Sequence, residues 1–520
     1  MADIVFINPR FEISYWGMEH ALPLLGKRAN MPVACLPLLA ALTPAGHSVT
    51  LVDENVEALD WERLARADIV GVTGMSVQRQ RMVEILTELK SRGVFTVVGG
   101  PWVSVQEDYF GDLADVIFIG EAEETWPQFL AQWQEGKHAG RYEQTEKSDM
   151  ARVPTPRFDL LKMHHYMFGS VQFSRGCPFQ CEFCDIIVTF GRRPRLKTSA
   201  QIIAELEALR AQNIDIAFIV DDNLIGNKKA IKVLLRDLIA YQQKHGFPFD
   251  FFTEVSLDLA EDEELLQLMV DANIISVFIG IETPNEKSLK ETKKYQNVRP
   301  AGTILERVHK IQRFGIEVWC GMILGFDNDD ATIFEAQSRF LKEARISTAM
   351  IGMLSAIPKT PLHDRLAHEG RLDPSDAPEF GTNVIPLRLS RKELRDGYVQ
   401  LMADVYQPET YFDRLEDLYL REKMPYNQAV VRYWKHHPWA WLKTQARNLI
   451  TSGVLFHRLM KATPEASLRR EYRRLLARVL RARPDPNILV LFLFKCAMHY
   501  HQFTLAQQMS TGRSRIYNTI

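Results

Sequence analysis

The sequence predicts an α/β protein with two parallel-sheet domains and a helical C-terminal extension. Strand-like apolar runs alternate with helical stretches up to about residue 145, and the alternation returns after about residue 166. After about residue 386 the strand-like runs give way to helical patterns rich in aromatic residues. The length of 520 residues also exceeds that of one ordinary domain. We therefore predict domains at 1–145, 166–385 and 386–520, with an extended, proline-containing connector at 146–165.

Composition and charge restrict the class of protein. Hydrophobic residues make up 46% of the chain and charged residues 25%, which is typical of a soluble globular protein. The net charge of −2 argues against nucleic acid as a partner. We expect no signal peptide, because a strand-like run follows Asp3 without a basic region before it, and no transmembrane helix, because the sequence has no apolar run of about 18 residues. Six cysteines in a chain of this length are typical of the reducing cytoplasm, so we expect a cytoplasmic protein.

The first domain is predicted to be a doubly wound, flavodoxin-like sheet. Its expected strands alternate with helical stretches such as Val77–Arg92, and they are Ile4–Asn8, Val49–Asp53, Ile69–Thr73, Thr96–Val98 and Val116–Ile119. Ligands of such sheets bind beyond the carboxyl ends of the strands. The candidate binding residues at these ends are Asn8, Glu54, Asn55, Met75, Ser76, Gly99, Gly100, Pro101, Gly120 and Glu121.

These strand ends predict a cleft of nucleotide or cofactor size without naming its ligand. Glycines there let the backbone approach a flat ligand closely. The first strand is not followed by G-x-G-x-x-G, which disfavours a nicotinamide or flavin dinucleotide.

The central segment is predicted to be a partial (β/α)6 barrel. Six strand-like runs alternate with helical ones, beginning at Val171–Phe173 and ending at Thr348–Leu354. The chemistry of parallel barrels lies at the carboxyl ends of their strands. The first of these ends carries the most informative motif of the chain.

That motif is a set of three cysteines, Cys177, Cys181 and Cys184, spaced C-x3-C-x2-C in one loop. Three close thiolates fit a [4Fe-4S] cluster and leave one iron open for a chelating substrate. A zinc site would need a fourth ligand at comparable spacing, and none follows closely. Plain buried cysteines are the other alternative, and we apply that interpretation to the scattered Cys35, Cys320 and Cys496.

The motif, with Phe183 just before its third cysteine, resembles that of the radical S-adenosylmethionine (SAM) enzymes. The resemblance implies that the open iron binds SAM and that an electron from an external flavodoxin or ferredoxin type of donor cleaves it to a 5′-deoxyadenosyl radical. It also implies that Phe183 and acidic groups at strand ends hold SAM; these are Asp221, Asp222, Glu254 and Glu282. A carboxylate suits a cationic amine and a diol, although each could instead cap a loop. The basic run 191–197 could bind an anion or be a solvated loop.

The domain order resembles that of the cobalamin-binding radical SAM class. The strand ends Val98-Gly99-Gly100-Pro101 and Ile119-Gly120-Glu121 are similar to those of that class. The chain lacks D-x-H-x-x-G, the signature in which a histidine ligates cobalt, so the resemblance implies cobalamin bound without a histidine. The loop through His20 could cover the corrin, but we favour a packing or surface role for His20.

The C-terminal extension offers a possible peripheral membrane contact. A helix expected after Thr463-Pro464 places its apolar residues on one face and many arginines beside them: Leu468, Tyr472, Leu475, Leu476, Val479 and Leu480 form that face. Such a helix could lie on an anionic membrane. The alternative, that the face packs on its own domain, is favoured. The run Ile488–Phe494 is short and is expected to be core.

With this extension the chain resembles the subgroup of hopanoid C-2 methylases and bacteriochlorophyllide C-methyltransferases. The resemblance implies methylation of an unactivated carbon in a large apolar substrate, through a 5′-deoxyadenosyl radical and methylcobalamin. A hopanoid-type lipid is the favoured substrate and a tetrapyrrole the next. An anaerobic oxidative cyclase or hydroxylase of the same family is one alternative. A non-catalytic cobalamin or redox-binding protein is the alternative from another class.

Overall fold

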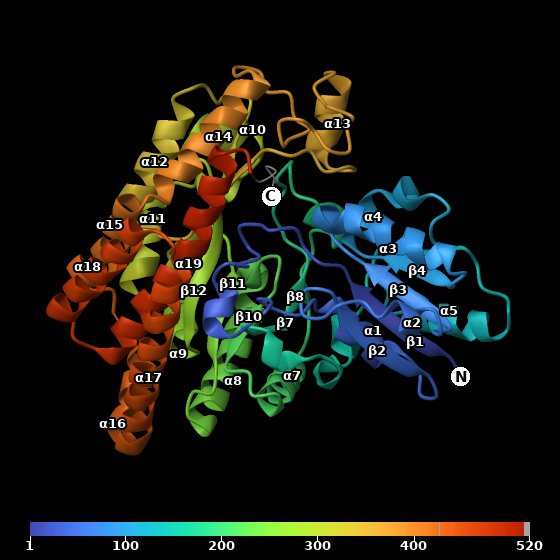
Figure 1. Ribbon diagram of the computed structural model, residues 1–520, viewed down its shortest axis with the longest axis horizontal. Coiled ribbons are helices and arrows are strands. Elements are labelled where there is room, and N and C mark those ends of the chain that lie inside the picture. Colours follow the sequence, from blue (N-terminus) through green and yellow to red (C-terminus); the bar gives the residue numbers. More distant parts are fainter. Residues whose placement is uncertain (426, 514–520) are drawn as a thin grey trace.

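A computed structural model describes residues 1–425 and 427–513. The chain forms three regions side by side: the N-terminal sheet, the central barrel and the C-terminal helices (Figure 1). The last seven residues of the predicted third domain lie outside the described residues.

The N-terminal sheet has six parallel strands in the order β2-β1-β3-β4-β5-β6. The strands are β1 Asp3–Asn8, β2 Ser48–Asp53, β3 Ile69–Thr73, β4 Thr96–Gly99, β5 Val116–Ile119 and β6 Arg141–Glu143. The helices that cover them are α1 Cys35–Leu42, α2 Trp61–Leu64, α3 Arg79–Ser91, α4 Pro101–Val105 and α5 Thr125–Gln134. The doubly wound fold is therefore confirmed. Strand order reverses between β1 and β3, where ligands of such sheets bind.

The central sheet also has six parallel strands, in the order β14-β13-β12-β11-β10-β7. Because the first and last strands do not pair with each other, the barrel is partial, as predicted. The strands are β7 Gly169–Val171, β10 Ile216–Ile219, β11 Asp250–Glu254, β12 Ile274–Glu282, β13 Glu317–Leu324 and β14 Ala349–Met353. A short antiparallel hairpin, β8 Ser174–Arg175 with β9 Arg195–Leu196, flanks the cysteine loop.

Most of the barrel helices begin where the sequence provides a side-chain cap; α6 and α12 do not. Thr198 and Gln201 form a capping box at the start of α7, and Thr303 and Glu306 do so for α11. The helices are α6 Ile186–Thr189, α7 Ser199–Ala211, α8 Lys228–His245, α9 Glu263–Asp271, α10 Glu286–Glu291, α11 Ile304–Arg313, α12 Ile333–Glu343 and α13 Pro361–His368.

The described residues of the extension contain six α-helices, which pack against the barrel. They are α14 Arg391–Val405, α15 Pro408–Glu416, α16 Gln428–His436, α17 Pro438–Ala462, α18 Ala466–Ala482 and α19 Pro486–Ser510. The apolar face of α18 is buried within this region, from Leu468 to Val479, whereas Leu480 is 49% exposed. The packing interpretation of this face is thus confirmed for all its predicted members except Leu480, and the membrane interpretation of α18 is wrong.

Helix α19 is longer than the run Ile488–Phe494 that the sequence predicts as core. By length and composition it could cross a membrane, and 56% of its apolar window is buried inside the protein. Lys495 lies within it and forms an ion pair of 2.5 Å with Glu317 of β13. A helix that places a buried cation against the barrel is a core helix. The role in the core that the sequence predicts for Ile488–Phe494 therefore extends to the rest of α19.

Candidate active site

The cysteine loop follows the first barrel strand, at the carboxyl edge of the sheet. Gly176 opens it with φ +100°, and a Cβ there would lie 2.9 Å from the carbonyl oxygen of Gly191. Only glycine fits this position without strain. The Cys177 amide in turn donates to that carbonyl oxygen (3.2 Å), which fixes the direction in which the loop leaves the strand.

Side-chain amides from the loop after β10 and from the turn after α10 point at the thiols. Asn223 Nδ2 lies 4.0 Å from Cys177 Sγ, and Gln296 Nε2 lies 3.5 Å from Cys181 Sγ. Hydrogen bonds to sulfur stabilise the thiolates that ligate iron–sulfur clusters. Among the described residues no three His, Cys, Asp or Glu side chains converge as ligands of one metal ion. The three thiolates that hold a cubane cluster lie further apart than the ligands of a single metal ion, because each thiolate binds a different iron.

The predicted acidic residues Asp221 and Asp222 hold the cysteine loop. Asp221 accepts from the Phe173 amide (2.7 Å) and the Ser174 hydroxyl (2.6 Å), and Asp222 accepts from the Gly176 amide (2.6 Å). Burial raises the pKa of Asp221 to about 7 and that of Asp222 to about 6. Both oxygens of Asp221 are used within the fold, so this residue positions the loop.

Glu254 and Glu282 come from the ends of β11 and β12. Burial, with the nearby charges of Asp222 and Asp221, raises the pKa of Glu254 to about 7. Glu282 has φ +66° and forms an ion pair of 2.6 Å with Lys294. A buried carboxyl group with a raised pKa gains from a cationic ligand. This feature fits the positively charged amino and sulfonium groups of SAM.

Lys294 is a site residue that the sequence analysis missed. Its ammonium group lies 5.9 Å from the ring of Phe183, and burial opposes its charge. Glu282 and the thiols of Cys181 and Cys184 outweigh burial and raise the pKa of Lys294. Lys294 lies between Phe183 of the cysteine motif and Glu282 at the end of β12. The loop after α10 places it there, and no sequence pattern predicts the course of that loop.

The switch point of the N-terminal sheet is built by a polar network. Asn8 donates to Asp53 (3.1 Å) and accepts from Gln78 (2.9 Å), while Asn55 accepts from the Phe11 amide (2.9 Å). Glu54 accepts from Arg81, with Nε at 2.9 Å. Several predicted ligand-binding side chains thus hold one another and shape the edge of the sheet.

Gly100 is needed at the end of β4. It has φ +103°, and a Cβ would lie 2.4 Å from Thr73 Oγ1. The neighbouring strand end carries Met75, which is 46% exposed, and Ser76. Gly99, Pro101 and Gly120 lie on the adjoining strand ends, as the sequence predicts.

A cleft of about 1370 Å³ opens at this edge. It is lined by Arg10, Ser76 and Trp102, which follow strands β1, β3 and β4, and by Ile357 and Asp376 from the loops beyond β14. Pockets for drug-sized ligands are about 300–1,000 Å³, so this cleft suits a larger molecule. A second cleft of about 680 Å³, lined by Glu54 and Asn55, lies nearby.

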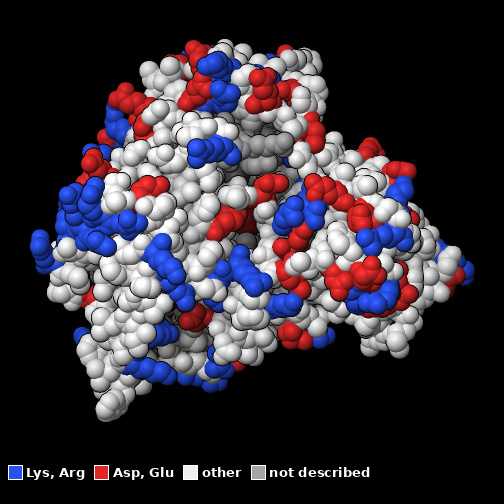
Figure 2. All heavy atoms as spheres, viewed as in Figure 1, with Lys and Arg blue, Asp and Glu red and all other residues white. Residues whose placement is uncertain are grey.

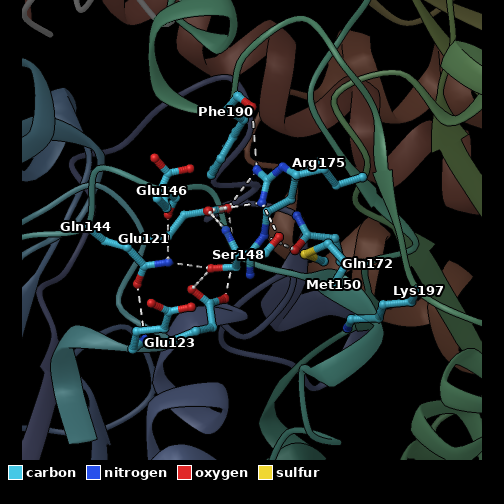
Figure 3. Close-up of polar contacts among 12 residues, drawn as sticks. Glu121, Glu123, Gln144, Glu146, Ser148, Met150, Gln172, Arg175, Phe190 and Lys197 are labelled. Carbon is cyan, nitrogen blue, oxygen red and sulfur yellow. Dashed lines mark hydrogen bonds and ion pairs between the residues drawn. The ribbon is translucent and has the colours of Figure 1, made fainter. Parts of the chain in front are cut away.

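Glu121 belongs to an ion-pair cluster that joins the N-terminal sheet to the β8–β9 hairpin beside the cysteine loop (Figure 3). Its carboxylate accepts from Arg175 Nη1 (2.9 Å), from Arg195 (2.8 and 3.0 Å) and from the Ser148 amide (2.7 Å). Both its oxygens are therefore engaged, and only 2% of the side chain is exposed. This geometry corrects the prediction that Glu121 faces the ligand of the first domain.

Two members of the basic run after the cysteines have structural partners. Arg195 pairs with Glu121, and Lys197 forms a buried ion pair with Glu205 of α7. At these two positions neither of the expected roles, an anion site or a solvated loop, applies.

His20 and the three cysteines outside the motif pack against neighbouring side chains. The ring of His20 is 5.5 Å from that of His501 in α19, which agrees with a packing role. Cys320 and Cys496 are fully buried, and Cys35 is partly buried.

Aromatic side chains line the inner face of the barrel. Phe218 and Phe252 stack at 4.7 Å on neighbouring strands, and Trp319 of β13 lies 5.6 Å from Phe252. Trp16, from the long loop after β1, lies 5.5 Å from Phe278 of β12. Glu254 lies on the same strand as Phe252, two residues along, so this apolar wall leads to the acidic strand ends.

Three family models match the chain: a B12 binding domain over residues 31–130, the Radical SAM superfamily over 171–337 and a domain of unknown function over 360–515. The chain is 40% identical over 427 residues to an uncharacterised methyltransferase of Synechocystis sp., covering 81% of this chain and 79% of that one. It is 37% identical over 419 residues to the hopanoid C-2 methylase of Rhodopseudomonas palustris, covering 79% and 78%.

The chain belongs to the cobalamin-binding radical SAM methyltransferases.

Solved structures share its fold. The radical SAM methyltransferase TsrM of Kitasatospora setae, with cobalamin and a [4Fe-4S] cluster bound, has a TM-score of 0.60 at 17% identity and covers 79% of this chain and 90% of its own. The cobalamin-dependent radical SAM enzyme OxsB, with aqua-cobalamin and SAM bound, has a TM-score of 0.60 at 14% identity and covers 99% and 82%. The cofactors of the present protein are a [4Fe-4S] cluster, SAM and cobalamin.

Proposed function

We propose that this enzyme methylates an unactivated carbon of a large apolar substrate, with a hopanoid-type lipid favoured and a tetrapyrrole next. The observation that carries the proposal is the aromatic inner wall of the barrel, which leads from Phe218 and Phe252 towards Glu254. Such a wall suits an extended apolar molecule and excludes water from a radical reaction. The identity of 37% to a hopanoid C-2 methylase supports the lipid.

The proposal assigns the cofactors to particular residues. Cys177, Cys181 and Cys184 hold the cluster, and Asn223 and Gln296 donate to their sulfurs. Phe183, Asp222, Glu254 and the Glu282–Lys294 pair surround SAM, while Asp221 supports the loop. Cobalamin lies at the edge formed by Asn8, Glu54, Asn55, Met75, Ser76, Gly99, Gly100, Pro101 and Gly120, beside the large cleft.

The cofactors supply a hydrogen-abstracting radical and a transferable methyl group. The protein side chains orient them, keep the site dry and compensate the charge of SAM. An electron donor of flavodoxin or ferredoxin type provides the reducing equivalents. The net change in the substrate is the replacement of one hydrogen by one methyl group.

Incubation of the reconstituted enzyme with methyl-labelled SAM tests the proposal. Under anaerobic conditions, a desmethyl hopanoid and a bacteriochlorophyllide are offered separately, and products are analysed by mass spectrometry. We expect one labelled methyl group in the hopanoid. Labelled methyl in the tetrapyrrole alone would replace the favoured substrate. Oxygen from labelled water in either product, without methyl transfer, would contradict the proposal and indicate the oxidative alternative.

A further inference from the structure

The hairpin of α16 and α17 exposes an unusual amount of apolar surface. Trp439 is 82% exposed, Ile450 69%, Leu449 53% and Leu442 47%. With Ala446 between them, these residues follow one another at intervals of three and four, so they form one stripe along α17. Single exposed apolar residues are ordinary, but a continuous stripe indicates an interaction surface.

Most of α17 packs against α19, but the first turns of α17 extend beyond the N-terminal end of α19. Asn448 donates to Asn487 near the start of α19 (2.8 Å), and Tyr500 of α19 donates to the carbonyl oxygen of Ala462 (2.9 Å). The two helices therefore run parallel, and residues 438–447 lie before the first residue of α19. Figure 1 shows this hairpin as the lowest part of the molecule, away from both ends of the chain.

The charged side chains of the hairpin segment itself have one sign. No Asp or Glu occurs between Glu422 and Glu465, whereas that segment contains seven Lys and Arg residues. Arg432 and Arg447 pair with Asp271 and Asp215 at the rim of the barrel. Lys435 and Lys443 have no ion pair with any described residue. On the face shown in Figure 2, the tip of the hairpin carries white atoms and, near them, blue ones.

We propose that the α16–α17 hairpin docks the enzyme on an anionic lipid bilayer. Tryptophan prefers the membrane interface because its ring is apolar and its N–H is polar. The stripe would enter the headgroup region, with the helix lying in the plane of the surface and Lys435 and Lys443 next to the anionic headgroups. A second copy of the chain fits less well, because its stripe would bring the same cations together.

The proposed surface lies at the opposite end of the barrel from the cysteine loop. Asn427, directly before α16, donates to Asn273 (2.9 Å), which precedes β12, and Asp215 precedes β10. The hairpin thus packs at the amino ends of strands whose carboxyl ends carry the site. Substitutions in the stripe therefore leave the cofactor residues untouched, and the proposal holds whichever substrate is methylated.

Flotation of the holoenzyme with lipid vesicles tests the proposal. Vesicles contain phosphatidylcholine alone or with about one-third phosphatidylglycerol, a fraction that creates an anionic surface. We expect binding to the anionic vesicles, and at least about tenfold weaker binding for Trp439→Ser combined with Ile450→Ser, because two interfacial apolar groups are lost. Lys435→Gln combined with Lys443→Gln should remove the preference for the anionic vesicles, and salt should weaken binding of the wild type.

Two matched controls separate the stripe from general surface effects. Leu480→Ser on α18 and Val233→Ser on α8 each remove an exposed apolar residue, of 49% and 54% exposure, and should bind as the wild type does. Circular dichroism checks that every variant is folded. Quenching of tryptophan fluorescence by brominated lipid, weaker in Trp439→Phe because Trp441 of the same turn remains exposed, locates the contact directly.

Two results would overturn the proposal. One is equal vesicle binding by the wild type and the Trp439→Ser, Ile450→Ser variant. The other is a dimer that forms without lipid and dissociates when Trp439 is replaced, which would assign the stripe to self-association.

Discussion

Replacement of Glu121 by glutamine tests how the cobalamin domain is fixed to the barrel. Glu121 follows β5 of the first sheet, while Arg175 immediately precedes the glycine that opens the cysteine loop. Burial alone would raise the pKa of Glu121, but the hydrogen bonds from Arg195 and the charge of Arg175 outweigh it and lower the pKa. The variant keeps the size of the side chain and removes its charge.

The expected loss follows from what each arginine retains. Arg175 keeps Glu123, at 2.6 Å, whereas Arg195 keeps, among the described residues, the carbonyl oxygens of Ser148 and Phe190. Removing one partner of a buried ion pair costs about 3–5 kcal/mol. Because one arginine remains paired, we expect Glu121→Gln to lower the free energy of unfolding by about 3 kcal/mol.

Urea unfolding followed by tryptophan fluorescence measures this loss, with cluster absorbance as a second probe. The two probes should separate in the variant, because the domains no longer unfold together. In the wild type, the contribution of Glu121 is present above the ordinary pKa of a glutamate and is lost as the pH falls through its lower folded-state pKa. The variant should lack this part of the acid dependence.

Glu143→Gln is the matched control for Glu121→Gln. Glu143 pairs with Arg141 at 2.8 Å on the surface of the same sheet, with both side chains about half exposed. Such a pair contributes about 0–1 kcal/mol. If Glu121→Gln were no more destabilising than Glu143→Gln, the role of the cluster as the connection between domains would be refuted.

Three further predictions concern the cofactors and the core. Replacement of any motif cysteine by alanine should abolish cluster absorbance and SAM cleavage, because too few thiolates remain to hold the cluster. The same change at Cys35, Cys320 or Cys496 should leave the cluster intact. Full iron content in a motif variant would contradict the assignment. Reconstituted enzyme should bind cobalamin without an imidazole ligand, because His20 packs against His501, and a spectrum with a histidine on cobalt would contradict this. Acid should destabilise the protein through His499, whose burial lowers its pKa to about 3 from 6.5, so that stability is lost as the pH falls from 6.5 towards 3. One pH unit below 6.5 the loss is about 1.4 kcal/mol, and denaturant unfolding of His499→Gln should show a flatter pH dependence in this range.

The strands and the three cysteines could be predicted because their signals are local. A parallel strand is a short buried run, and Ile69–Thr73 matches β3 residue for residue. Lys294, Asn223 and Gln296 could not be found in this way. Asn223 follows β10, whereas Lys294 and Gln296 lie in the segment after α10, and only the closure of the sheet brings these two segments to the cysteine loop. The three-residue strand β6 also escaped prediction, because Arg141 and Glu143 are exposed and only Tyr142 is buried.

The roles of charged and amphipathic segments depend on partners that the local sequence does not contain. Arg195 lies in a basic run typical of an anion site, yet its partner is a carboxylate of another domain. Helix α18 has the pattern of a membrane-surface helix, yet Tyr472 within its apolar face is fully buried and bonds to His499 of α19. Helix α17 has the same kind of stripe, but its first turns begin before α19 and expose Trp439. An amphipathic pattern therefore predicts that a helix has an apolar face, and the length and position of the neighbouring helix decide whether the protein itself covers it.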